Sequence, residues 1–96
     1  MFNGNYSNPI SESLTESNVT YRPTKNVVVY AQFITGNLNS EYWCNVFIND
    51  KILMSNSFIN NTGYCLNMAF GAIFVPKGSK LTFAGNGGSV VYVVSD

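Results

Sequence analysis

The sequence predicts an all-β domain built as an antiparallel β-sandwich. Most of the chain consists of short runs rich in Val, Ile, Phe and Tyr, the residues that suit a pleated, half-buried surface. Asn, Gly and Pro separate these runs, and no apolar stripe with helical spacing occurs. Short strands spaced by turns in a chain of 96 residues are typical of one sandwich or barrel with a single core.

Six longer strands and two short ones are expected. The longer ones are Val27–Ile34, Trp43–Asn49, Lys51–Met54, Leu66–Val75, Lys80–Ala84 and Val90–Ser95, and the short ones are Asn5–Ser7 and Asn18–Tyr21. Ser13 and Glu16 have the spacing of a helix capping box, but no apolar stripe follows them. We therefore expect Ser11–Ser17 to be a loop with at most one helical turn. Residues 1–17 then form an extension and a loop, and residues 18–96 form the core.

Four connections carry recognisable turn residues. Asn49-Asp50 predicts a two-residue hairpin loop, because both residue types tolerate positive φ. Val75–Gly78 has Pro second and Gly fourth, the preference of a type I turn. Arg22–Asn26 predicts another turn, with Asn26 in the left-handed conformation. Gly85–Gly88 predicts a flexible hairpin tip between the last two strands.

The alternation of side chains separates two kinds of strand. Strands such as Lys80–Ala84 have one apolar and one polar face, as expected at the surface of a sandwich. By contrast, Val27–Ile34, Leu66–Val75 and Val90–Val94 are apolar on both faces. A two-layer sandwich has one interior, and no helix is predicted to cover the outside. The outer apolar face of these strands is most simply covered by another copy of the chain.

Charge and composition exclude several function classes. Five Lys or Arg balance five Asp or Glu, which excludes capture of nucleic acid or of an anionic membrane by clustered positive charge. The longest apolar stretch is shorter than the roughly 20 residues of a spanning helix, so we expect no membrane insertion. Histidine is absent, which excludes histidine bases and histidine-ligated metals. We expect no enzyme activity, no cofactor and no metal site.

The polar surface must consist of amides and hydroxyls. Charged residues make up 10% of the chain, against roughly 25% in an ordinary soluble domain. The sequence has fourteen Asn and ten Ser. Such a surface gives little charge repulsion between copies, which again favours a defined oligomer.

Cys44 and Cys65 are the two cysteines of the chain. Two cysteines are too few for a metal site, and nothing indicates export to an oxidising compartment. Cys44 alternates in phase with Val46 and Ile48 and should face the core. We expect two free thiols, with a disulfide between them as the alternative.

The order of the turn and strand motifs resembles a known group of proteins. The motifs are SNVTYRPTKNVVVYAQF, VFINDKIL, AIFVPKGSKLTFAG and a closing VVYVVS. Together they resemble the head domains that end bacteriophage tail fibres and receptor-binding proteins, and the wider trimeric jelly-roll group with the complement C1q and tumour-necrosis-factor heads. The resemblance covers Asn18–Ser95. It implies a jelly-roll-like homotrimer with the last strand near the threefold axis, located on a virion.

Two segments combine aromatic rings with several amides, Asn37–Trp43 and Asn56–Tyr64. Aromatic faces stack on sugars while amides and carboxylates bind hydroxyls, so this mixture suits a neutral glycan. The expected stacking residues are Tyr42, Trp43 and Tyr64, and the expected hydrogen-bonding residues are Asn39, Glu41, Asn60 and Asn61. A hairpin between the segments can bring both to the same end. The alternative is that Trp43 packs inside and the amides only form turns.

Three functions follow from these observations. The first is a trimeric head at a fibre tip, joined to the rest of the fibre or virion, which binds a bacterial surface glycan or protein without chemistry. The second is a phage decoration or cement protein that binds capsid or baseplate. The third, a soluble lectin-like or cytokine-like head, is disfavoured because the N-terminus lacks the features of a signal peptide.

Overall fold

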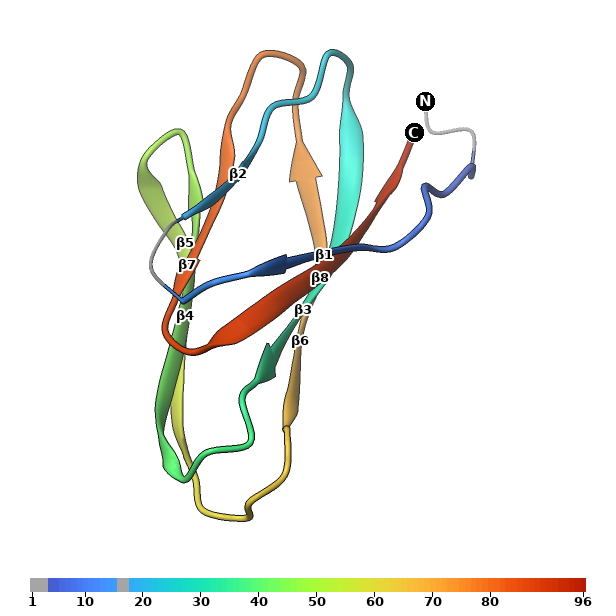
Figure 1. Ribbon diagram of the computed structural model, residues 1–96. Coiled ribbons are helices and arrows are strands. Elements are labelled where there is room, and N and C mark those ends of the chain that lie inside the picture. Colours follow the sequence, from blue (N-terminus) through green and yellow to red (C-terminus); the bar gives the residue numbers. More distant parts are fainter. Residues whose placement is uncertain (1–3, 16–17) are drawn as a thin grey trace.

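The computed structural model describes residues 4–15 and 18–96, which form a two-layer antiparallel sandwich (Figure 1). The strands are β1 (Ile10–Ser13), β2 (Val19–Tyr21), β3 (Val27–Thr35), β4 (Ser40–Ile48), β5 (Lys51–Asn60), β6 (Asn67–Val75), β7 (Leu81–Gly85) and β8 (Gly88–Ser95). Sheet A has the order β1-β8-β3-β6, and sheet B has the order β2-β7-β4-β5. The prediction of an all-β antiparallel fold is confirmed.

The core lies between the two sheets and is filled by alternate residues of each strand. Val29 and Phe33 of β3 are fully buried, as are Val46 of β4 and Phe83 of β7 from the other sheet. The rings of Phe83 and Tyr92, which belong to different sheets, stack with their centroids 5.7 Å apart. The buried side chains of both sheets therefore pack into one core between the layers.

The hairpin at Asn49-Asp50 forms as predicted. Both residues have positive φ, 49° and 67°, and Ile48 pairs with Lys51 across the turn. Positive φ at both central residues is the signature of a type I′ turn. An ion pair of 2.6 Å between Lys80 Nζ and Asp50 Oδ1 joins this turn to the segment before β7.

The turn after β6 lies one residue later than predicted. Ser79 N donates to Pro76 O at 3.0 Å, and Gly78 has a φ of 83°. Glycine at the third position with positive φ indicates a type II turn, so the predicted type I turn at Val75–Gly78 is wrong. Asn26 does not take the left-handed conformation either. Its side-chain Oδ1 instead accepts a hydrogen bond of 2.9 Å from Lys77 N.

The connection at Gly85–Gly88 crosses between the sheets and is no hairpin tip. β7 lies in sheet B and β8 in sheet A, so the predicted pairing of the last two strands is wrong. The backbone of this connection passes close to the end of β3, because a Cβ atom on Gly88 would lie 2.4 Å from Ile34 O. Only glycine fits at this position.

The N-terminal segment belongs to the sandwich. β1 pairs with β8, and Leu14 behind it is fully buried, so the loop expected over Ser11–Ser17 is wrong for its first half. Glu16 and Ser17 lie outside the described residues. The expected Asn5–Ser7 strand is reduced to one bridge between Tyr6 and Ser95. The expected boundary at residue 17 therefore does not separate an extension from the core.

All three strands that are apolar on both faces are neighbours in sheet A. Their order, β8-β3-β6, places their second faces together on the outside of the molecule. A bulge in β6 pairs Gly71 with Ala31 but Ala69 with Gln32. Phe70 therefore packs against the core on the same side as Ile73, although strict alternation would put them on opposite faces. The outer face of sheet A carries Val28, Tyr30, Ile34, Val91, Val93, Ala69, Ala72 and Phe74 around Gln32.

Candidate functional site

The two predicted segments lie partly in strands, since residues 40–43 belong to β4 and residues 56–60 to β5, and their remaining parts, residues 37–39 and 61–64, meet at one end of the sandwich. Residues 36–39 join β3 to β4, and residues 61–66 join β5 to β6, at the bottom of Figure 1. Asn39 Oδ1 accepts a hydrogen bond of 3.1 Å from Gly63 N, which links the two connections. We call these two connections the loop end. The C-terminus lies at the opposite end, where Asp96 N donates to Asn5 O at 3.1 Å.

Asn60 holds the loop end together from inside. Its side chain is 0% exposed. Its Nδ2 donates to Tyr64 O at 2.7 Å and to Thr35 Oγ1 and Gly36 O, both at 3.2 Å. Its Oδ1 accepts from Thr62 N at 3.0 Å and from Thr62 Oγ1 at 2.8 Å. Because these bonds occupy both ends of a buried amide, the prediction that Asn60 binds a ligand is wrong.

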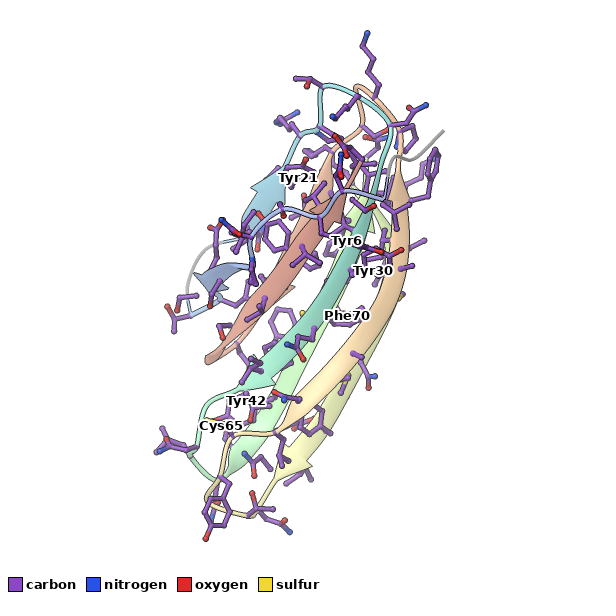
Figure 2. All side chains as sticks on the ribbon, turned by 90° about the vertical axis from the view of Figure 1, so that its right-hand side faces the viewer. Tyr6, Tyr21, Tyr30, Tyr42, Cys65 and Phe70 are labelled. Carbon is purple, nitrogen blue, oxygen red and sulfur yellow. The ribbon has the colours of Figure 1, made fainter. Side chains whose placement is uncertain are left out.

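Tyr42 is also buried and helps to hold the loop end in place (Figure 2). It is 3% exposed, and its hydroxyl donates to Leu38 O at 3.0 Å. The side chain lies against Gly36 and Gly87, since a Cβ atom on Gly36 would come within 3.0 Å of the Tyr42 hydroxyl and one on Gly87 within 3.1 Å of the ring. A buried ring offers no face for stacking, so the predicted binding role of Tyr42 is wrong. The phase of β4 explains this, since Tyr42 alternates with buried Cys44.

The loop end presents Tyr64 and Leu38 to solvent. Tyr64 is 75% exposed, as its predicted role requires, and Leu38 is 73% exposed. Asn39 and Asn61 are exposed beside them. The sequence prediction missed Leu38, although a leucine between two asparagines in a turn segment is a recognisable signal for an exposed apolar side chain.

Trp43 and Glu41 lie on the outer face of sheet B, near the loop end. In the β4–β5 ladder Trp43 is paired with Ser57, and Glu41 with the exposed Ile59. Trp43 is partly exposed, so the alternative that it packs inside is wrong. Asn86 fixes this part of β4, because its Oδ1 accepts from Trp43 N at 2.7 Å and its Nδ2 donates to Glu41 O at 3.0 Å.

Both cysteines are free, as predicted. Cys44 faces the core, and burial raises the pKa of its thiol to about 12. A thiol with this pKa stays protonated at neutral pH and is a poor nucleophile. Cys65 is exposed in the loop end.

Tyr92 is a second titratable group whose surroundings shift its pKa. Burial raises the pKa of Tyr92, and the Glu12 carboxylate, which accepts a hydrogen bond of 3.5 Å from the Tyr92 hydroxyl, adds to this shift. Residues 4–15 and 18–96 contain no group of three Cys, Asp or Glu side chains that could hold a metal ion. Within the same residues, no helix is long and apolar enough to span a membrane.

The loop end is thus a rigid, neutral surface. Neither of its two connections contains a charged residue, while one aromatic ring, one leucine and the amides of Asn37, Asn39 and Asn61 are exposed. Its backbone is fixed by the hydrogen bonds of Asn60, Tyr42 and Asn39, so little entropy is lost when a ligand binds. Comparisons of the chain with protein-family models, curated proteins and solved structures give no match.

Proposed function

We propose that the chain is a non-enzymatic, virion-associated head domain that binds a host-cell-surface receptor through the loop end. The observation that carries this proposal is the placement of Tyr64 and Leu38, about three-quarters exposed, on a backbone fixed from inside by Asn60. Exposed apolar side chains on rigid loops are the usual anchors of recognition sites.

The strand order supports the resemblance to jelly-roll heads. Two four-stranded sheets with the orders β1-β8-β3-β6 and β2-β7-β4-β5 have the connectivity of an eight-stranded jelly roll. Jelly rolls include viral capsid and lectin domains. In our proposal the rest of the fibre or virion is attached at the end opposite the loops, which directs the loop end outward.

The receptor that fits the loop end is neutral. Tyr64 offers an aromatic face, and the amides of Asn39 and Asn61 offer donors and acceptors for hydroxyl groups. Without charge, each site gains no long-range attraction, so affinity per copy is low. Several copies on one particle compensate by binding a repetitive surface together.

The assembly in this proposal is a homotrimer that uses the outer face of sheet A. This face of β8, β3 and β6 is turned away from sheet B, and it is apolar across all three strands. Contiguous exposed apolar surface of this kind usually marks an interface. Three loop ends then point in one direction.

Replacing Tyr64 and Leu38 by Ala tests the site. We expect each variant to weaken adsorption of the trimer to susceptible cells by tenfold or more, since losing an anchor costs roughly 1–2 kcal/mol per copy. The melting temperature should stay nearly unchanged, because Tyr64 takes part in the Asn60 network through its backbone oxygen. Lys77→Ala, in the exposed turn at the other end, is the control. Normal adsorption of both loop variants would place the binding site elsewhere.

A decoration or cement protein is the second candidate, favoured by the same apolar face. An extended apolar sheet face would also suit a flat partner surface on a capsid or baseplate. The two functions differ in what the purified protein binds. Binding to capsids or baseplates without adsorption to cells would favour the cement role.

A further inference from the structure

An exposed indole ring and a carboxylate lie side by side on the outer face of sheet B. Trp43 and Glu41 are two residues apart in β4, so their side chains leave the same face of the strand. Sheet B lies at the left of Figure 1, and this face is turned away from the core. Trp43 is 39% exposed, and Glu41 is exposed as well. The neutral site proposed at the loop end uses neither residue.

Asn86 holds the backbone that carries both side chains. The β4–β7 ladder ends at the pair of Cys44 and Gly85, so β4 has no strand partner on this side beyond that point. Asn86 replaces this partner, because it bonds to the backbone of Trp43 and of Glu41 through its side chain and again to Trp43 O through its own N–H, at 3.3 Å. A surface fixed in this way loses little entropy when a ligand binds.

The neighbours on β5 leave the indole accessible. Trp43 is paired with Ser57, whose small side chain cannot cover an indole ring. Glu41 is paired with Ile59, which is 71% exposed. The surface therefore combines one aromatic ring, one branched aliphatic side chain and one carboxylate, with room for a ligand above the ring.

Glu41 is a carboxylate without a compensating charge. Two ion pairs occur within residues 4–15 and 18–96, and neither involves Glu41. The other charged residue in the strands of sheet B is Lys51, which is paired with Ile48. Ile48 lies seven residues along β4 from Glu41, about 23 Å, which exceeds the range of exposed charges at physiological salt. The carboxylate and the face of the indole both favour a cation at this place.

We propose that Trp43 and Glu41 form a second binding site, for a sugar that carries a free ammonium group. The C–H face of the sugar ring stacks on the indole, and the ammonium group donates to the carboxylate. The Cα atoms of the two residues are about 6.6 Å apart, a separation that one sugar ring with its substituent spans. A lysine side chain fits less well, because it offers no flat apolar face to the indole. The site is complete within one chain and does not depend on the receptor site at the loop end.

Tryptophan fluorescence tests this site directly, because Trp43 is the only tryptophan of the chain. The purified protein is titrated with a tetramer of glucosamine and, separately, with a tetramer of N-acetylglucosamine, which has the same ring faces but no charge. We expect the amine tetramer to change the emission and to bind about fivefold more tightly, the upper range for an exposed ion pair. High salt should remove the difference. Equal affinity for the two tetramers, or binding of neither, would overturn the inference.

Substitution of the carboxylate assigns the charge contact. Glu41→Gln should lower the affinity for the amine tetramer to that for the acetylated one, since the ring contact with Trp43 remains. Glu12→Gln, an exposed carboxylate on sheet A, is the matched control and should change neither titration. Wild-type affinity of Glu41→Gln for the amine tetramer would contradict the proposed contact. A lysine tetrapeptide that competes as well as the amine tetramer would show that the site selects charge alone and would refute the assignment to a sugar.

Tyr64→Ala separates this site from the loop end. The variant should keep the full fluorescence response to the amine tetramer, whatever its effect on adsorption to cells. Failure of the fluorescence test would therefore leave the proposed receptor site untouched, and failure of the adsorption test would leave the Trp43 site untouched. Loss of amine binding in Tyr64→Ala would mean that the two surfaces form one site and would overturn the inference of a second one.

Discussion

Replacing Tyr30 by Glu should convert the proposed trimer into a folded monomer. Tyr30 is 40% exposed in the single chain and lies at the centre of the outer face of sheet A, paired with Ala72 and Val93. Its ring lies 5.8 Å from that of Tyr6, so the two form one aromatic surface. A carboxylate buried there without a partner costs several kcal/mol at each of the three contacts. Light scattering should give the mass of one chain, with the circular dichroism spectrum unchanged.

Two variants control this result. Tyr92→Glu should unfold the chain, because Tyr92 is buried between the sheets, stacked on Phe83 and already next to the Glu12 carboxylate. Thr20→Glu, exposed on β2 at the edge of sheet B, should leave both mass and fold unchanged. If the Tyr30 variant keeps the mass of the wild-type assembly, the outer face of sheet A is not the interface.

Asn60→Ala should destabilise the domain by about 3 kcal/mol. The substitution leaves Gly36 O, Tyr64 O and the Thr62 donors without the amide that pairs them in a water-poor site. Each buried group left unsatisfied costs about 1–3 kcal/mol, part of which is regained by rearrangement or entry of water. This is a large share of the 5–15 kcal/mol that holds an ordinary domain together. Urea denaturation measures the difference directly.

Asn61→Ala is the matched control for that prediction. Asn61 is the next residue in the chain, has the same side chain and is exposed. Its substitution should change stability by less than about 0.5 kcal/mol. Equal effects of the two substitutions would mean that Asn60 does not hold the loop end.

Composition and alternation were sufficient to predict most of the sheet structure. β3, β6 and β8 are long apolar runs, and the Asn49-Asp50 hairpin has residues that tolerate positive φ. β1 could not be predicted, because ISES has no alternation and is held by backbone pairing to β8. The β-bulge at Phe70 could not be predicted either, because no local sequence signal shows where one strand has an extra residue relative to its partner.

The candidate site was predicted in its place but only partly in its residues. The two segments meet as expected, because the hairpin between them folds the chain back on itself. Composition could not distinguish a residue that binds a ligand from a residue that holds a loop in place. The sequence therefore predicted Asn60 and Tyr42 as binding residues, although both are buried. Burial separates them, and it depends on the strand register that places Tyr42 and Asn60 on the inner face of sheet B.

The mass of the wild-type protein tests the central claim, that the apolar outer face of sheet A joins three copies. Light scattering at micromolar concentration should give three times the chain mass of 10.6 kDa and should not change on moderate dilution. Salt should have little effect, since neither β3, β6 and β8 nor the two connections of the loop end contain a charged residue. A mass of 10.6 kDa across this range would contradict the claim and leave the outer face of sheet A without the partner we assign to it.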